Sequence, residues 1–93
     1  MVTRRDARTD ENQPEILEAL NKVGAWYCYI KYPLDLLIAY RGNLYIGEIK
    51  REGAKLNKNQ QKVFKELMLR GVIPLLIETP EDALMGIGAI SPL

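Results

Sequence analysis

The stretch that decides the fold is residues 34–50, which read LDLLIAYRGNLYIGEIK. Two apolar runs, 34–40 and 44–49, flank Arg41-Gly42-Asn43, and a short polar segment with glycine between such runs predicts a β-hairpin. Apolar residues occupy both faces of each run, which is typical of strands covered by helices on both sides. Residues 34–50 therefore predict two neighbouring strands within a layered α/β fold.

Upstream of the hairpin, the sequence predicts one helix and one strand. The helix begins near Pro14, with Asn12 as its N-cap and Gly24 as its C-cap. Its apolar stripe consists of Ile16, Leu17, Leu20 and Val23. Residues 26–30, WYCYI, are aromatic and β-branched, so they predict a strand that ends before Pro33.

Downstream, the sequence predicts a second helix, a fourth strand and a short last helix. Asn57 can cap the second helix, which runs to about Arg70, and Gln60 extends its apolar stripe by one turn. That stripe is expected to be buried at Val63, Phe64, Leu67 and Met68. Residues 72–77 predict the strand, and residues 79–82, TPED, begin the last helix. The expected order is α-β-β-β-α-β-α, with a mixed sheet covered by helices.

Length and composition predict one soluble domain. The 93 residues are enough for a single core, so we expect one domain over residues 1–93, with 1–11 as a flexible basic arm that carries Arg4, Arg5 and Arg8. The 13 basic and 12 acidic residues nearly cancel, so net charge alone does not indicate a nucleic-acid partner. The sequence has neither a signal-peptide pattern nor a membrane-spanning run, so we expect no membrane association and a cytoplasmic location.

The composition also limits the chemistry. The chain has no histidine and one cysteine, Cys28, which excludes Ser-His and Cys-His catalysis, histidine-ligated metals and multi-cysteine zinc sites. Cys28 lies in an apolar run and is expected to be a reduced, packed thiol. Any acid-base or metal chemistry must therefore use carboxylates and lysine.

The candidate catalytic residues are Asp35, Glu48 and Lys50. Residues two apart in a strand share a face, so Glu48 and Lys50 lie together. Asp35 joins them if the hairpin loop has two or four residues, whereas a three-residue loop would turn it away. We favour the two-residue loop, because Gly42 suits a tight turn.

Burying two carboxylates together on an apolar face is costly unless a cation or hydrogen bonds compensate, and a divalent metal is the natural compensator. Mg²⁺, or Mn²⁺ in its place, prefers oxygen ligands, so Asp35, Glu48 and the carbonyl group of Ile49 form a plausible partial coordination sphere. Lys50 can orient an attacking water or neutralise developing charge. The alternative is structural: Asp35 opens a strand, and Glu48 pairs with Lys50 on a solvated face.

Three segments carry a resemblance to a known family. Residues 34–37 (LDLL), 46–50 (IGEIK) and 55–60 (KLNKNQ) resemble the PD-(D/E)XK nuclease superfamily, and more narrowly the virus-type replication-repair nuclease (VRR-NUC) domain in its short stand-alone phage form. The match covers residues from about 5 to 87. Asn57 stands where the family has threonine or serine, and the proline before the acid is displaced by one position, to Pro33.

The resemblance implies a restriction-endonuclease-like core and Mg²⁺-dependent hydrolysis of DNA. It implies branched or otherwise structured DNA in replication, repair or recombination, and a homodimer that acts on two strands. The apolar tail at residues 87–93 would gain from being covered by a second copy.

The resemblance also implies further site residues. Gln60 occupies the position of the family's helix glutamine, although it could instead cap its own helix. A polar residue of the first helix is expected near the metal, and Gln13 and Glu15 compete for that role. Gln13 lies on the apolar stripe, seven residues before Leu20, so it is preferred.

Basic residues after the third strand predict a surface that follows DNA phosphates. They are Arg51, Lys55 and Lys58, followed by Lys62 and Lys65, for which a solvated helix face is an equal explanation. Two other functions stay open: a catalytically inactive nucleic-acid-binding relative, and a small α/β interaction module.

Overall fold

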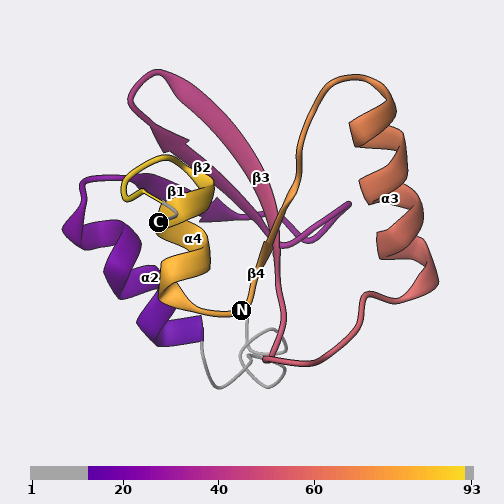
Figure 1. Ribbon diagram of the computed structural model, residues 1–93, viewed down its shortest axis with the longest axis horizontal. Coiled ribbons are helices and arrows are strands. Elements are labelled where there is room, and N and C mark those ends of the chain that lie inside the picture. Colours follow the sequence, from indigo (N-terminus) through magenta and orange to yellow (C-terminus); the bar gives the residue numbers. More distant parts are fainter. Residues whose placement is uncertain (1–12, 92–93) are drawn as a thin grey trace.

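The computed structural model describes residues 13–91, which form a mixed α/β fold (Figure 1). The elements, in chain order, are α2 (Gln13–Lys22), β1 (Trp26–Tyr29), β2 (Leu36–Tyr40), β3 (Asn43–Ile49), α3 (Lys58–Leu69), β4 (Leu75–Ile77) and α4 (Pro80–Gly86). One sheet contains the strands in the order β1-β2-β3-β4, with β1, β2 and β3 antiparallel and β4 parallel to β3. The predicted α/β class with a mixed sheet is therefore confirmed. Between residues 13 and 91 the helices and strands follow one another as expected, although β2 and β4 begin later than predicted.

The hairpin between β2 and β3 has a two-residue loop, as expected. Tyr40 pairs with Asn43, which leaves Arg41 and Gly42 as the turn, with φ of 48° and 84°. Both residues adopt the left-handed backbone conformation, which matches the twist of the flanking strands. Glycine adopts this conformation without steric cost, so the turn fixes the register of the two strands.

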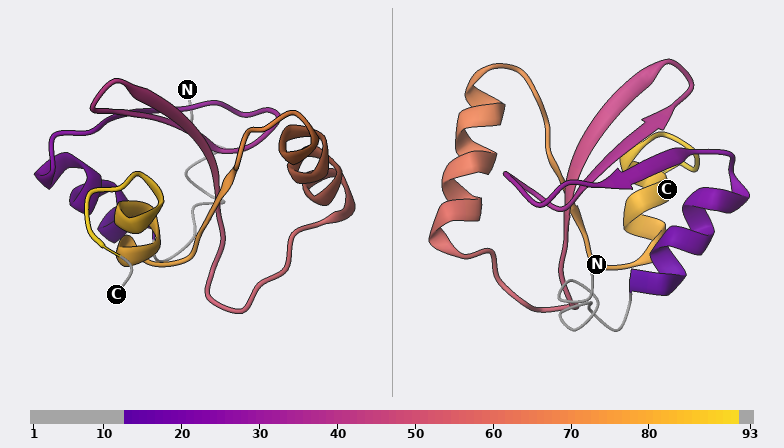
Figure 2. Two further views of the ribbon diagram at one scale, coloured as in Figure 1. Left: turned by 45° about the horizontal axis from the view of Figure 1, so that its top comes forward. Right: turned by 180° about the vertical axis from the view of Figure 1, so that it is seen from behind.

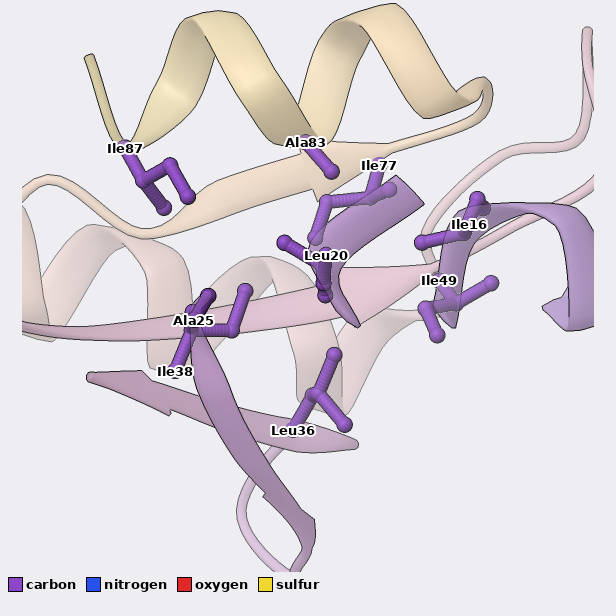
Figure 3. Packing of buried hydrophobic residues seen from close by; sticks show 9 residues of the cluster. All are labelled: Ile16, Leu20, Ala25, Leu36, Ile38, Ile49, Ile77, Ala83 and Ile87. Atoms are coloured by element: carbon purple, nitrogen blue, oxygen red, sulfur yellow. The ribbon is translucent and has the colours of Figure 1, made fainter. Parts of the chain in front are cut away.

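The core lies on one face of the sheet, beneath α2 and α4 (Figures 2 and 3). Its buried cluster comprises Ile16, Leu20, Ala25, Leu36, Ile38, Ile49, Ile77, Ala83 and Ile87. Full burial of one such branched aliphatic side chain contributes about 1.5–3 kcal/mol. Leu36 and Ile38 point to the same face of β2, so Leu37 and Ala39, which alternate with them, point to the opposite face.

Helix α3 departs from expectation. Most of it stands off the sheet, on the side away from α2 and α4 (Figures 1 and 2), and none of its residues is fully buried. Its first turn reaches β3, where the amide group of Gln60 donates to Glu48 Oε2 at 2.6 Å. Val63, Phe64 and Leu67 are half-buried, whereas Met68 is 54% exposed, so the predicted burial of Met68 is wrong. Among residues 13–91, α2 and α4 cover one face of the sheet, and the first turn of α3 reaches the other. Helical spacing identifies the apolar side of a helix but not what packs against it.

The segment after α4 also corrects an expectation. Ile87 is only 3% exposed and belongs to the core cluster, and the hydroxyl group of Tyr45 donates to its carbonyl oxygen at 3.3 Å. Ile87 therefore needs no second copy to cover it. Ile90 stays 40% exposed, and Pro92 and Leu93 lie outside the described residues. Between residues 13 and 91, no helix combines the length and hydropathy needed to cross a membrane.

Candidate metal-binding active site

Glu48 is the buried acid of the candidate site. It is only 4% exposed, and it pairs with Leu76 of β4 on the sheet face opposite the core. The amide group of Gln60 donates to Glu48 Oε2 at 2.6 Å, and Lys50 Nζ lies 4.0 Å from the same oxygen. A buried carboxylate is costly unless charged or hydrogen-bonding partners compensate it. Here a lysine and an amide supply that compensation, and the strand spacing that predicted the Glu48–Lys50 proximity holds.

Gln60 performs two tasks at once. Its Oε1 accepts from Asn57 N at 2.9 Å, while Asn57 Oδ1 accepts from Gln60 N at 2.8 Å, which completes a capping box at the start of α3. Its Nε2 donates to Glu48. The capping role and the contact with the candidate site, which were alternatives in the sequence, are therefore both present. Through this one side chain, the first turn of α3 is attached to the carboxylate on β3.

Asp35 reaches the same part of β3 through a different geometry. Leu36 pairs with Gly47, yet Asp35 N also donates to the Gly47 carbonyl group at 3.1 Å. Two residues of one strand thus lie opposite one residue of the other, which is the arrangement of a β-bulge. The next donor on β3, Ile49 N, is bound by Asp35 Oδ2 at 3.0 Å. The carboxylate of Asp35 therefore lies directly beside the backbone between Glu48 and Lys50.

The two candidates on the first helix differ in position. Gln13 is buried at the start of α2 and its side-chain amide donates to the hydroxyl group of Tyr29 on β1. Glu15 is exposed. The inward orientation that favoured Gln13 is confirmed, while its role at a metal stays a prediction. Tyr29, its partner, was not identified from the sequence, where it looked like one of several aromatic strand residues.

The basic candidates lie on the surface. Arg51, Lys55 and Lys58 are all exposed, in the connection after β3 and at the first residue of α3. Lys62 and Lys65 are exposed on α3 as well, and Arg4, Arg5 and Arg8 lie outside the described residues. The connection is held to the end of β4, because Gly53 N donates to Glu78 Oε2 at 3.2 Å. Glu78 is thus, after Tyr29, a second hydrogen-bonding residue that the sequence did not indicate.

The donor set suits a hard cation. Two carboxylates, Asp35 and Glu48, lie at one end of β2 and β3, with the Ile49 backbone between them. Within residues 13–91, no group of three acidic, histidine or cysteine side chains forms a complete protein cage. Mg²⁺ is commonly bound by one or two carboxylates and keeps several waters, so this limited set fits it.

Comparison of the chain with models of protein families, with curated proteins and with solved structures found no match.

Proposed function

We propose that this chain is a divalent-metal-dependent deoxyribonuclease with a restriction-endonuclease-like fold, whose site consists of Asp35, Glu48, Lys50 and Gln60. The observation that carries the proposal is the environment of Glu48. A carboxylate that is almost fully buried lies between a lysine and an amide on an exposed helix, and a second carboxylate is bound to the adjacent backbone N–H. Such a set of polar groups on an apolar sheet face is costly for stability and suits metal-assisted hydrolysis.

The carboxylates of Asp35 and Glu48 and the carbonyl group of Ile49 would hold Mg²⁺ or Mn²⁺. When bound, the cation polarises a phosphoryl oxygen and lowers the pKa of a coordinated water. Lys50 places a positive charge 4.0 Å from Glu48 Oε2, where it orients the attacking water and stabilises negative charge that develops on the phosphate. Gln60 fixes the rotamer of Glu48 through its 2.6 Å hydrogen bond. Gln13 donates to Tyr29, which pairs with the core residue Leu36 and therefore lies on the sheet face opposite Glu48. A role for Gln13 at the metal is proposed from the family resemblance alone.

The proposed substrate is DNA, recognised mainly through its phosphates by Arg51, Lys55 and Lys58. These residues follow the candidate site in sequence and are exposed, as phosphate contacts require. Branched or otherwise structured DNA, and a homodimer that presents two sites, are proposed from the family resemblance.

Cleavage of junction, flap and linear DNA by the purified chain tests the proposal. We expect cleavage with Mg²⁺ or Mn²⁺, none with EDTA, and a loss of at least about 100-fold in Glu48→Gln, since this change removes the anionic ligand at nearly constant volume. Glu66→Gln is the matched control, because Glu66 is exposed on α3 and forms its ion pair with Arg70, away from the candidate site.

Cleavage that persists in EDTA or in Glu48→Gln would contradict the assigned site. Salt-dependent DNA binding without metal-dependent cleavage would instead identify a catalytically inactive binding relative. A chain that neither binds DNA nor responds thermally to Mg²⁺ would fit an interaction module.

A further inference from the structure

Two rows of apolar side chains cross the sheet on the face opposite the core. The strand register aligns Trp26, Ala39 and Leu44 in one row, and it aligns Cys28, Leu37 and Ile46 in the next. These positions alternate with Leu36 and Ile38, which point into the core. We call these six residues the outer patch. None of them carries a charge.

The outer patch has little cover within residues 13–91. Trp26 is 58% exposed and Leu44 is 65% exposed, and the other four are half-buried. Helices α2 and α4 lie on the other face. Helix α3 lies on the side of the sheet away from them, next to the tip of the connection between β1 and β2 (Figures 1 and 2), and its first turn reaches Glu48 through Gln60. The row of Trp26, Ala39 and Leu44, at the opposite end of β3 from Glu48, contains the two most exposed residues of the patch. An indole ring and a leucine side chain exposed in one cross-strand row cost solvation free energy in the isolated chain.

We infer that a second copy of this chain docks on the outer patch, so that two sheets pack face to face about a twofold axis. This inference rests on the homodimer of the proposed function but not on its cleavage activity. Two sheets can pack at about 10 Å with interdigitating side chains, which would bury the patch of each copy against that of the other.

The area of the patch agrees with this occupant. The exposed parts of Trp26 and Leu44, together with the half-buried neighbours, present on the order of 400 Å² of apolar surface. A standard interface buries about 800 Å² per partner, somewhat more than half of it apolar. The outer patch therefore supplies most of the apolar centre that such an interface needs.

Charge and sequence favour a second copy of the chain as the partner that covers the outer patch, rather than residues 1–12 or 92–93 of the same chain. An uncharged patch can face itself across a twofold axis without repulsion between like charges. Residues 1–12 read MVTRRDARTDEN, in which most positions are charged or polar, so they do not match the apolar rows. Residues 92–93 are too few to cover six side chains.

Trp26 provides an internal probe, because it is the only tryptophan in the chain. We expect sedimentation velocity to show a dimer, and the Trp26 emission maximum to move to shorter wavelength, as the protein concentration rises from about 1 to 100 μM. Leu44→Asp should raise the dimer dissociation constant by at least about 100-fold, since each dimer would bury two unpaired carboxylates. Leu44 is largely exposed in one chain, so far-UV circular dichroism should stay unchanged.

Leu69→Asp is the matched control. Leu69 is as exposed as Leu44 but lies at the end of α3, away from the patch, so this variant should dimerise like the original chain. A monomer at 100 μM would overturn the inference. A dimer that persists in Leu44→Asp would also overturn it, and would indicate that the two copies pair in another way, for example along the edge strand β1. Because the readouts are mass and emission, a chain that dimerises without cutting DNA would refute the nuclease proposal and leave this inference standing.

Discussion

Replacing Gln60 with glutamate separates its two tasks, because the two predict opposite changes in stability. The introduced carboxylate would still accept from Asn57 N, as glutamate does in a capping box, and its charge is favourable in the first turn of a helix by about 0.3–1 kcal/mol. It would no longer donate to Glu48. If Gln60 only capped α3, Gln60→Glu would therefore be neutral or slightly stabilising.

The geometry at Glu48 predicts a clear loss instead. The 2.6 Å hydrogen bond ends on a carboxylate whose side chain is 5% exposed, and losing such a bond to a charged group costs about 1.5–3 kcal/mol. Two carboxylates about 4 Å apart add repulsion on the order of 4 kcal/mol at an effective dielectric constant of 20, before side chains relax and Lys50 offsets part of it. We expect a net loss of at least about 2 kcal/mol in the free energy of unfolding, which lowers the Tm by about 10 °C.

Urea denaturation in EDTA, followed by circular dichroism, measures this difference. Asn57→Ala is the control that removes the N-cap and keeps the donor to Glu48, and it should cost only about 1 kcal/mol. A Gln60→Glu chain as stable as the original, or more stable than Asn57→Ala, would refute the argument that Gln60 holds Glu48. In the proposed metal site, the added carboxylate should also make Mg²⁺ raise the Tm more in Gln60→Glu than in the original chain.

Three further predictions follow from the fold. Gly42→Ala should lower the free energy of unfolding by about 1 kcal/mol, because alanine is strained in the left-handed backbone there. Gly47→Ala should lower it by about 1–3 kcal/mol, because the added Cβ would lie 2.9 Å from Ile77 Cδ1. A larger loss for Gly42→Ala than for Gly47→Ala in urea denaturation would contradict this reasoning. Ile87→Ala should lower the free energy of unfolding by about 2–4 kcal/mol, because it leaves a cavity in the core. Ile90→Ala, at an exposed position, should lower it by less than about 1 kcal/mol. Equal losses for the two variants would contradict the burial of Ile87. Backbone amides of α3 should exchange with deuterium before those of β2 and β3, since no α3 residue is fully buried; equal protection would mean that the helix packs more closely than described.

The local sequence determined the elements and their ends. Gly42 fixed a two-residue turn, because a left-handed residue is needed there, and Asn57 and Thr79 both cap the helices that they were expected to begin. Strand spacing alone placed Glu48 and Lys50 on one face. These features depend on backbone conformation and on neighbours within a few residues, which the sequence shows directly.

Contacts between distant segments were decided only by the tertiary structure. Spacing showed that α3 has an apolar side but not that the sheet would leave it half-covered, and composition suggested an exposed tail where Ile87 enters the core. A two-residue loop was expected to bring Asp35 to Glu48 by strand pairing. Instead, Asp35 and Leu36 form a bulge opposite Gly47, and the Asp35 carboxylate accepts from Ile49 N, the backbone group next to Glu48. Such an irregularity depends on how whole strands twist and pack, so it cannot be predicted from the local sequence.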